Sequence, residues 1–224
     1  MIRIESVNNY IEKYYNPVNF QMESLREEAE REHVPIILRE TEMFLGTILP
    51  LIKPKKILEI GAAIGYSALY FSYLLPESAV LSVERDDDMW EKAKTNVKEH
   101  SKMENIFVAH SDAVEFLETL QEDGDWKTGP FDLVFIDAAK SHYREFFDLA
   151  LPLTKEGSVI ICDNILMKGM TAEEEINKKH KTSIKKMRDF VNYICDIPNA
   201  ETSILSIGDG ISITKINRRT DEEN

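Results

Sequence analysis

The sequence predicts an α/β fold in which helices cover both faces of a seven-stranded, mostly parallel sheet. Short apolar segments rich in β-branched residues alternate with helical patterns from residue 57 to 197, as in doubly wound sheets. Two alternating segments, 203–207 and 211–216, flank Gly208-Asp209-Gly210 and predict an antiparallel hairpin at the end of the sheet. Further helical patterns precede the first strand.

The first part of the chain predicts amphipathic helices that precede the sheet. Apolar residues at helical spacing, with acidic outer faces, mark residues 4–15 and 18–33, which Asn16-Pro17 separates, and a third helical pattern covers 39–51. These helices are additional to the sheet, and we expect them to form a homodimer interface. The segment Val34 to Ile37 interrupts them either as a plain connector, which we favour, or as a cover over a ligand site.

The central part of the chain follows the order strand, helix, strand, which implies a parallel sheet with right-handed crossovers. The predicted strands are 57–60, 80–84, 106–110, 131–136 and 158–162. The predicted helices are 68–75, 86–100, 113–121, 141–151 and 173–197.

Length and composition predict a single domain. The 224 residues, 43% of them hydrophobic, suffice for one α/β core but leave no room for an independent second one. We divide residues 1–224 into N-terminal helices (1–52), a core (53–216) and a polar, flexible tail (217–224).

The sequence also predicts a cytoplasmic protein. It contains no apolar segment long enough to span a membrane, and the first residues lack a signal-peptide layout. The two cysteines, Cys162 and Cys195, fit a reducing compartment, and Cys162 lies within a predicted central strand. We therefore expect two reduced thiols without a chemical role.

The segment Lys56 to Ser67, KILEIGAAIGYS, predicts a buried strand, a tight turn and the start of a helix. Gly61 permits a positive φ or the close approach of a ligand, Gly65 opens the helix without steric cost, and Ser67 places a hydroxyl near the helix N-terminus. An anionic or carboxylate-bearing ligand fits such a turn. The glycine spacing differs from the dinucleotide fingerprint. It resembles the first motif of class I S-adenosylmethionine-dependent methyltransferases.

Polar residues stand where the predicted strands end, and ligands of doubly wound sheets bind at that edge. Glu84 ends the second strand, where its carboxylate can accept hydrogen bonds from both hydroxyls of a ribose. Asp112 follows the third strand, where it can meet an adenine amino group, cap the next helix, or do both.

The ends of the fourth and fifth strands predict a metal site. Asp137 follows the fourth strand, and Asp163 and Asn164 follow the fifth. Two carboxylates and an amide oxygen at adjacent strand tips suit Mg²⁺ and leave coordination positions for substrate oxygens and water. The alternative is that these residues are helix caps and turn residues.

The motifs FIDAAK and CDN, together with EIGAAIGYS, resemble the cation-dependent class I O-methyltransferases of the catechol and caffeoyl-CoA type. The resemblance covers residues 34–216. It implies a Rossmann-like class I methyltransferase fold, S-adenosylmethionine as methyl donor, and Mg²⁺ or another divalent cation. It also implies metal binding by Asp137, Asp163 and Asn164, and catalysis by Asp137 and by Lys140 as general base. The implied donor-binding residues are Ile37, Glu59, Gly61, Gly65, Ser67, Glu84, Ser111, Asp112, Ala113 and Asp137.

This chemistry restricts the acceptor. Methyl transfer from a sulfonium is an in-line displacement, and a divalent cation lowers the pKa of the attacking hydroxyl and fixes its direction. A cation held in this way favours acceptors with two adjacent oxygens. Catechols, caffeoyl groups and 5-hydroxyuridine meet this requirement.

The charge distribution bears on which acceptor is used. The formal net charge of −13 argues against polyanionic partners, but seven basic residues and three acidic ones lie between Lys168 and Arg188. This basic segment can contact the phosphates of an RNA loop whose target base is splayed into the pocket, or it is an ordinary solvated helix face. The candidate RNA-binding residues are Lys168, Lys178, Lys179, Lys181, Lys185 and Lys186.

The motifs HVPI, KKILEIGAAIGYSA, FIDAAK, CDN with Lys168-Gly169, and IGDGISITK resemble bacterial tRNA 5-hydroxyuridine methyltransferases. That resemblance implies conversion of wobble 5-hydroxyuridine to 5-methoxyuridine, with a tRNA anticodon loop as partner. The acidic run Glu173-Glu174-Glu175 departs from a uniformly basic surface. The alternatives are methylation of a small catechol-like or caffeoyl-CoA-like vicinal-diol metabolite, and a non-catalytic donor-binding protein.

Overall fold

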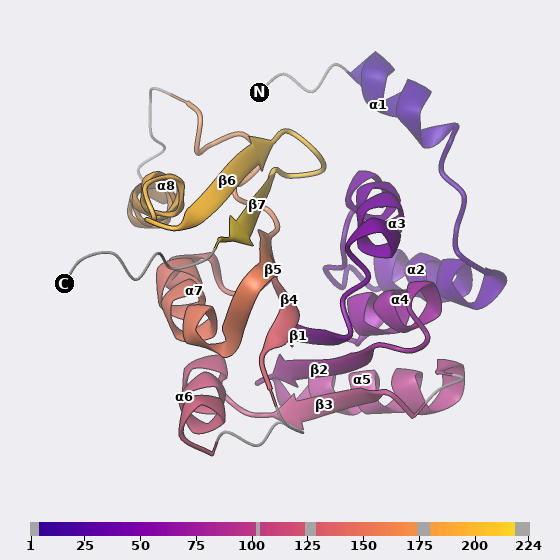
Figure 1. The fold of residues 1–224 in the computed structure, drawn as a ribbon. Helices are drawn as coiled ribbons and strands as arrows, with labels where there is room; N and C mark the ends of the chain where they lie inside the picture. Colours follow the sequence, from indigo (N-terminus) through magenta and orange to yellow (C-terminus); the bar gives the residue numbers. More distant parts are fainter. Residues whose placement is uncertain (1–4, 102–103, 124–128, 174–179, 218–224) are drawn as a thin grey trace.

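The computed structural model describes residues 5–101, 104–123, 129–173 and 180–217 of the chain (Figure 1). Its sheet has seven strands in the order β3-β2-β1-β4-β5-β7-β6. The strands are β1 (Lys56–Ile60), β2 (Ala79–Glu84), β3 (Ile106–His110), β4 (Phe131–Ile136), β5 (Thr154–Cys162), β6 (Ala200–Leu205) and β7 (Ile211–Ile216).

The strand pairing confirms the predicted fold class. β1 to β5 pair in parallel with their neighbours, whereas β7 runs antiparallel to both β5 and β6. The hairpin therefore closes the sheet with β7 inserted between β5 and β6. No helix in the described part of the chain is long and apolar enough to cross a membrane.

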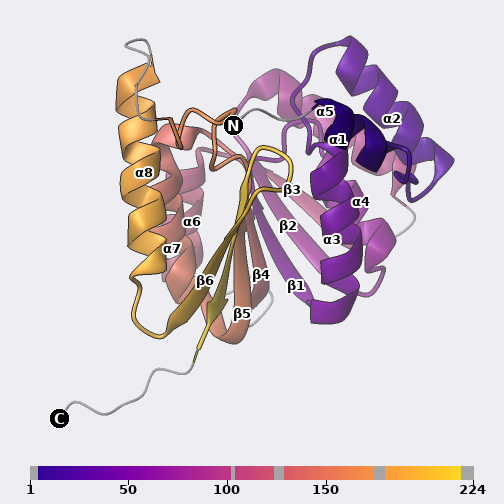
Figure 2. The ribbon, with the colours of Figure 1, turned by 90° about the horizontal axis from the view of Figure 1, so that it is seen from above.

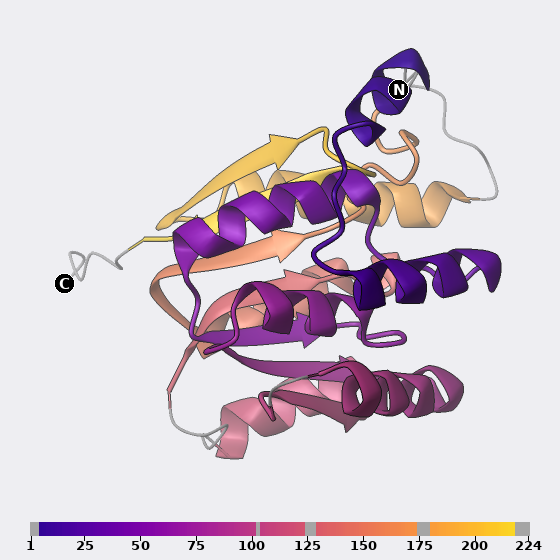
Figure 3. The same cartoon turned by 90° about the vertical axis from the view of Figure 1, so that its right-hand side faces the viewer.

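Helices cover both faces of the sheet (Figure 2). α6, α7 and α8 lie on one face, and α3, α4 and α5 lie on the other, where Figure 3 shows them one after another across the strands. The helices are α1 (Glu5–Glu12), α2 (Phe20–Arg31), α3 (Arg39–Ile52), α4 (Tyr66–Leu74), α5 (Asp87–His100), α6 (Ala113–Asp123), α7 (Tyr143–Ala150) and α8 (Lys181–Cys195), with 3₁₀ turns η1 (Lys140–His142) and η2 (Leu151–Leu153).

The core consists of two hydrophobic clusters separated by the sheet. Ile57 and Val80 pack toward α2, α3 and α4, whereas the next residue in each strand, Leu58 or Leu81, packs toward α6, α7 and α8. All four side chains are fully buried. Central parallel strands are apolar on both faces for this reason, which explains the continuous apolar runs in the sequence.

Several element boundaries differ from the prediction, and three of them concern the second half of the sheet and the helix α8. β6 spans 200–205 rather than 203–207, because its pairing with β7 leaves residues 206–210 as the connection. β5 begins at Thr154, four residues earlier than expected. α8 begins at Lys181 rather than at residue 173, and residues 165–172 form turns in which Met167 and Lys168 have positive φ. Residues 174–179 lie outside the described residues.

Candidate active site

The carboxyl ends of the central parallel strands open onto a cavity of about 670 Å³. Most residues predicted to bind the methyl donor line this cavity: Ile37, Gly61, Ser67, Glu84, Ser111, Asp112, Ala113 and Asp137. The two remaining ones, Glu59 and Gly65, do not. The lining also contains residues that the sequence did not single out, among them Tyr66, Met89, His142 and Phe146.

The turn after β1 explains why glycines are needed there. Gly61 has φ +96°, and a Cβ atom at this position would lie 2.2 Å from the backbone oxygen of Asp137. Its role is thus to let the ends of β1 and β4 approach each other. Gly65 has φ +77° and caps α4. Gly65 does not line the cavity and lies beside Ala93, so donor binding by this residue stays a prediction.

Glu59 lies behind the cavity rather than in it. Its side chain is fully buried and accepts hydrogen bonds from the hydroxyls of Ser67 and Ser82. Burial is the main reason that the pKa of Glu59 rises to about 7. The carboxyl group of Glu59 holds the Ser67 hydroxyl, and Ser67 lines the cavity whereas Glu59 does not. Donor binding by Glu59 stays a prediction.

Backbone amides hold the carboxylate of Glu84 at the end of β2. The Oε2 atom accepts from the amide of Ala63 at 2.8 Å, and Oε1 accepts from the amides of Arg85 and Asp86, both at 2.9 Å. Asp112 caps α6, since its Oδ1 accepts from the amide of Val114 at 2.9 Å, and it also lines the cavity. The two roles considered for Asp112 are therefore compatible.

The segment between α2 and α3 covers one side of the cavity. Pro35, Ile36 and Ile37 all line it, and Ile37 is 3% exposed. The reading of this segment as a plain connector is therefore wrong. The sequence signal for a cover over the cavity was a proline followed by two β-branched residues between two helices.

The predicted metal ligands meet at the ends of β4 and β5. Asp137 and Asn164 line the cavity, whereas Asp163 is fully buried beneath them. Asp163 Oδ1 accepts a hydrogen bond from the Asn164 amide at 2.7 Å. Its Oδ2 atom is buried without a hydrogen-bond partner in the described part of the chain. Burial and then the nearby charge of Asp137 raise the pKa of Asp163 to about 7.

This arrangement fits a divalent cation. An unpaired buried carboxylate oxygen is costly unless a cation or a proton satisfies it. Among the described residues, no three side chains of the types His, Cys, Asp and Glu form a metal-binding group. The set here instead combines two carboxylates with the amide of Asn164, which provides the hard oxygen donors that Mg²⁺ prefers.

Lys140 stands at the edge of this cluster. Its Nζ lies 2.9 Å from Asp137 Oδ1 and 3.1 Å from the hydroxyl oxygen of Tyr143. The Tyr143 hydroxyl donates to the backbone oxygen of Asp163 at 2.8 Å. Tyr143 thus connects Lys140 to the end of β5. The sequence interpretation missed Tyr143, although this residue lies only three residues after Lys140.

The described candidate RNA-binding residues lie on α8 and, for Lys168, in the turns that follow β5. Lys168, Lys181, Lys185 and Lys186 are exposed. Lys186 Nζ donates to the backbone oxygen of Ser141 at 3.3 Å, and Ser141 is the residue that follows Lys140 in the chain. Lys178 and Lys179 lie outside the described residues.

Cys162 is buried and Cys195 is exposed, and both are free thiols, as expected.

The fold and the cavity at the strand ends together define a class I methyltransferase architecture. The family model O-methyltransferase matches residues 13–217. The chain therefore belongs to this O-methyltransferase family, whose class I members use S-adenosylmethionine.

Individual relatives agree with this assignment. A flavonoid 3',5'-methyltransferase of Vitis vinifera is 27% identical, with 96% of this chain and 95% of the relative covered. A caffeoyl-CoA O-methyltransferase of Populus kitakamiensis is 28% identical, with the same coverage of 96% and 95%. A Staphylococcus aureus crystal structure provisionally assigned as a caffeoyl-CoA O-methyltransferase has a TM-score of 0.84 and 29% identity, covering 93% of this chain and 98% of the other.

Proposed function

We propose that the protein is an S-adenosylmethionine- and Mg²⁺-dependent O-methyltransferase that converts 5-hydroxyuridine to 5-methoxyuridine at the tRNA wobble position. The observation that carries the proposal is the placement of Lys186 beside Ser141. This contact brings one of the exposed lysines of α8 next to the residue that follows the candidate base Lys140. A phosphate backbone bound along α8 would deliver a splayed base to the cavity mouth.

The residues of the chain divide the reaction between them. The methyl donor would lie in the cavity, with its ribose near Glu84 and its adenine near Asp112. Asp137, Asp163 and Asn164 would hold Mg²⁺, which lowers the pKa of an acceptor hydroxyl and fixes its direction when bound. The hydroxyl proton would pass to Lys140 Nζ. The acceptor oxygen bonds to the methyl carbon while the carbon–sulfur bond of the donor breaks. The electron pair of the broken bond stays on sulfur.

The contact between Lys140 and Asp137 is compatible with this role. Without a cation, Lys140 neutralises the Asp137 carboxylate at 2.9 Å. A divalent cation bound to Asp137 would replace Lys140 as the main partner of that carboxylate. The released ammonium would then give up one proton to water, and the neutral amine could accept the proton of the acceptor hydroxyl.

The second candidate function is O-methylation of a small catechol-like or caffeoyl-CoA-like acceptor. The observation that favours it is the similarity to relatives named caffeoyl-CoA O-methyltransferase and flavonoid methyltransferase, which extends over nearly the whole chain. In this case the lysines of α8 would be an ordinary solvated surface.

One experiment separates the two functions. tRNA carrying 5-hydroxyuridine is incubated with the protein, S-adenosylmethionine and Mg²⁺, and its nucleosides are analysed by mass spectrometry. We expect 5-methoxyuridine that disappears when EDTA is added. A free catechol and a caffeoyl thioester are tested in parallel. Methylation of these compounds without modified tRNA would overturn the tRNA proposal in favour of the second candidate.

A further inference from the structure

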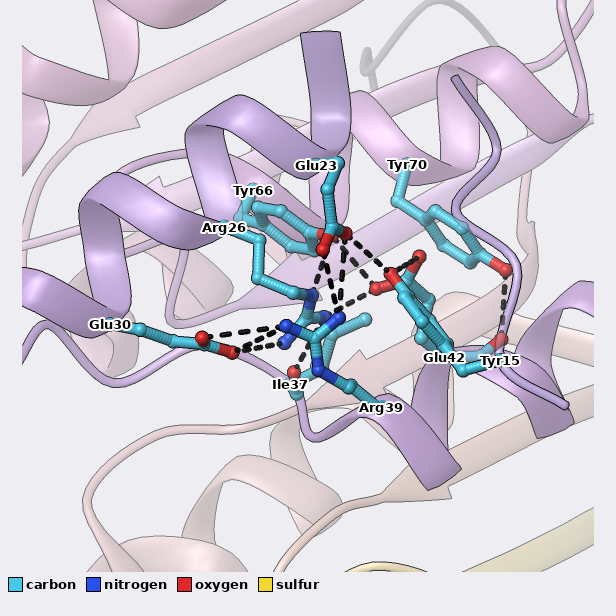
Figure 4. A network of polar contacts seen from close by, with 9 residues as sticks. All are labelled: Tyr15, Glu23, Arg26, Glu30, Ile37, Arg39, Glu42, Tyr66 and Tyr70. Atoms are coloured by element: carbon cyan, nitrogen blue, oxygen red, sulfur yellow. Dashed lines mark hydrogen bonds and ion pairs between the residues drawn. The ribbon is translucent and has the colours of Figure 1, made fainter. Parts of the chain in front are cut away.

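A buried ion pair joins two of the N-terminal helices, α2 and α3, beside Tyr66 of the core (Figure 4). The guanidinium of Arg26 in α2 contacts the carboxylate of Glu42 in α3, and each side chain is only 2% exposed. Removing two charges from water is costly, and such a pair persists only where further hydrogen bonds satisfy both groups.

The remaining hydrogen bonds of Arg26 lead to the wall of the cavity. Its Nη2 donates to the backbone oxygen of Ile37 at 3.0 Å, and its Nε donates to the hydroxyl of Tyr66 at 3.2 Å. The Tyr66 hydroxyl in turn donates to Glu42 Oε2 at 2.8 Å. Ile37 and Tyr66 both line the cavity. One guanidinium therefore fixes the cover segment and the start of α4 relative to each other.

A second, outer layer of charges surrounds this pair without reaching the cavity. Arg39 pairs with Glu23 at 3.1 Å and with Glu30 at 3.4 Å, and its side chain is 24% exposed. None of the contacts described for Arg39 involves Ile37. Tyr70 offers a buried comparison, because its hydroxyl donates to the backbone oxygen of Glu42 at 2.8 Å without lining the cavity.

We propose that Arg26, held by Glu42, is a positioning residue that keeps the Pro35–Ile37 segment closed over the methyl-donor cavity, so that donor affinity depends on this ion pair. The inference rests on the proposed use of the cavity for S-adenosylmethionine, but not on the acceptor. Arginine suits the role because its planar fork serves Ile37, Tyr66 and Glu42 at once, which the single ammonium of lysine cannot do.

The test compares Arg26→Lys with the wild-type protein. The variant keeps the charge beside Glu42 but loses the simultaneous contacts with Ile37 and Tyr66. If only about a tenth of the molecules keep the Pro35–Ile37 segment in its closed conformation, the apparent Kd of the donor rises about tenfold. We expect that rise in the calorimetric Kd for S-adenosylhomocysteine and in the KM for S-adenosylmethionine. The kcat at saturating donor should stay within about twofold, because the closed state itself is unchanged.

Tyr70→Phe is the matched control, since it removes a buried hydrogen bond to the same Glu42 residue. We expect it to lower thermal stability while changing the donor Kd by less than about twofold. Hydrogen exchange supplies a second readout, in which the amides of residues 36–38 should exchange faster in Arg26→Lys than in Tyr70→Phe. If Arg26→Lys does not fold, Glu42→Gln replaces it, because glutamine keeps the shape and removes the charge.

The outcomes are distinct. An unchanged donor Kd in the folded Arg26 or Glu42 variant would overturn the inference while leaving the proposed function intact. An equal loss of donor affinity in Tyr70→Phe would also overturn it, because general destabilisation would then explain the effect. A wild-type protein that binds no donor would refute both the use of the cavity and the role of Arg26.

Discussion

Lys140 Nζ lies 2.9 Å from Asp137 Oδ1, so the candidate general base and a candidate metal ligand form an ion pair. Both groups line the cavity. The pair explains how the carboxylate is neutralised without a cation.

Lys140→Met should abolish most of the proton transfer while leaving the donor cavity in place. Loss of a general base lowers kcat by about 10²- to 10⁴-fold. The binding of S-adenosylhomocysteine should change little, because Lys140 lies at the metal end of the cavity. Single-turnover rates and calorimetry measure the two effects. A kcat within a few-fold of wild type would assign the proton to water instead.

Asp163→Asn should weaken Mg²⁺ binding at least about tenfold, since it removes a ligand charge. In the wild-type protein, Mg²⁺ must displace the proton of a carboxyl group whose pKa burial and Asp137 raise to about 7. The affinity for Mg²⁺ should therefore rise with pH up to about 7 and level off above it. Titration calorimetry at several pH values tests this. A pH-independent affinity would contradict the assignment of Asp163 as a ligand.

Glu59→Gln should change the pH dependence of stability. Burial raises the pKa of Glu59 to about 7 from an ordinary value of 4.5. Between these values the unfolded chain loses the proton while the folded protein keeps it, so stability falls as pH rises through this window. The total effect is on the order of 3 kcal/mol. Urea unfolding at pH 5, 6 and 7 should show a flatter profile for the variant. An equally steep decline would mean that Glu59 is not responsible.

Replacing Lys181, Lys185 and Lys186 by glutamine should reduce tRNA modification and weaken its salt dependence, because fewer phosphates are then neutralised. Donor binding should be unaffected. The control is the replacement of Lys92, Lys94 and Lys98, which are exposed on α5, across the sheet from α8. Equal losses in both triple variants would indicate a non-specific charge effect rather than a binding surface.

We propose that the N-terminal helices form a homodimer interface, because large apolar side chains are exposed there. Phe20 is 81% exposed, Tyr10 59% and Tyr14 56%. Large exposed apolar side chains of this kind are typical of interaction surfaces. Light scattering at micromolar concentration should give twice the mass of one chain, and Phe20→Ser should shift it toward the mass of one chain. A wild-type mass of one chain would refute this proposal.

Local sequence patterns were sufficient to predict the order of elements and the residues at the strand ends. The continuous apolar runs of β1 and β4 identify strands buried on both faces, and the polar residue after each strand lies at one edge by topology alone. This is why Glu84, Asp112 and Asp137 were expected at the cavity. The local chemistry of Gly208-Asp209-Gly210 likewise placed the final hairpin, although not the register of β6.

Packing in three dimensions determines which of these groups reach the cavity. Glu59 belongs to the same motif as Ser67, but strand alternation buries it behind the wall, where the hydroxyls of Ser67 and Ser82 satisfy it. Arg26 falls on the apolar stripe of α2 together with Met22, Leu25 and Ala29. A charge on such a stripe signals a buried partner but does not identify it. Arg26 and Glu42 are 16 residues apart in different helices. Their pairing follows from helix packing, which spacing along the chain does not encode.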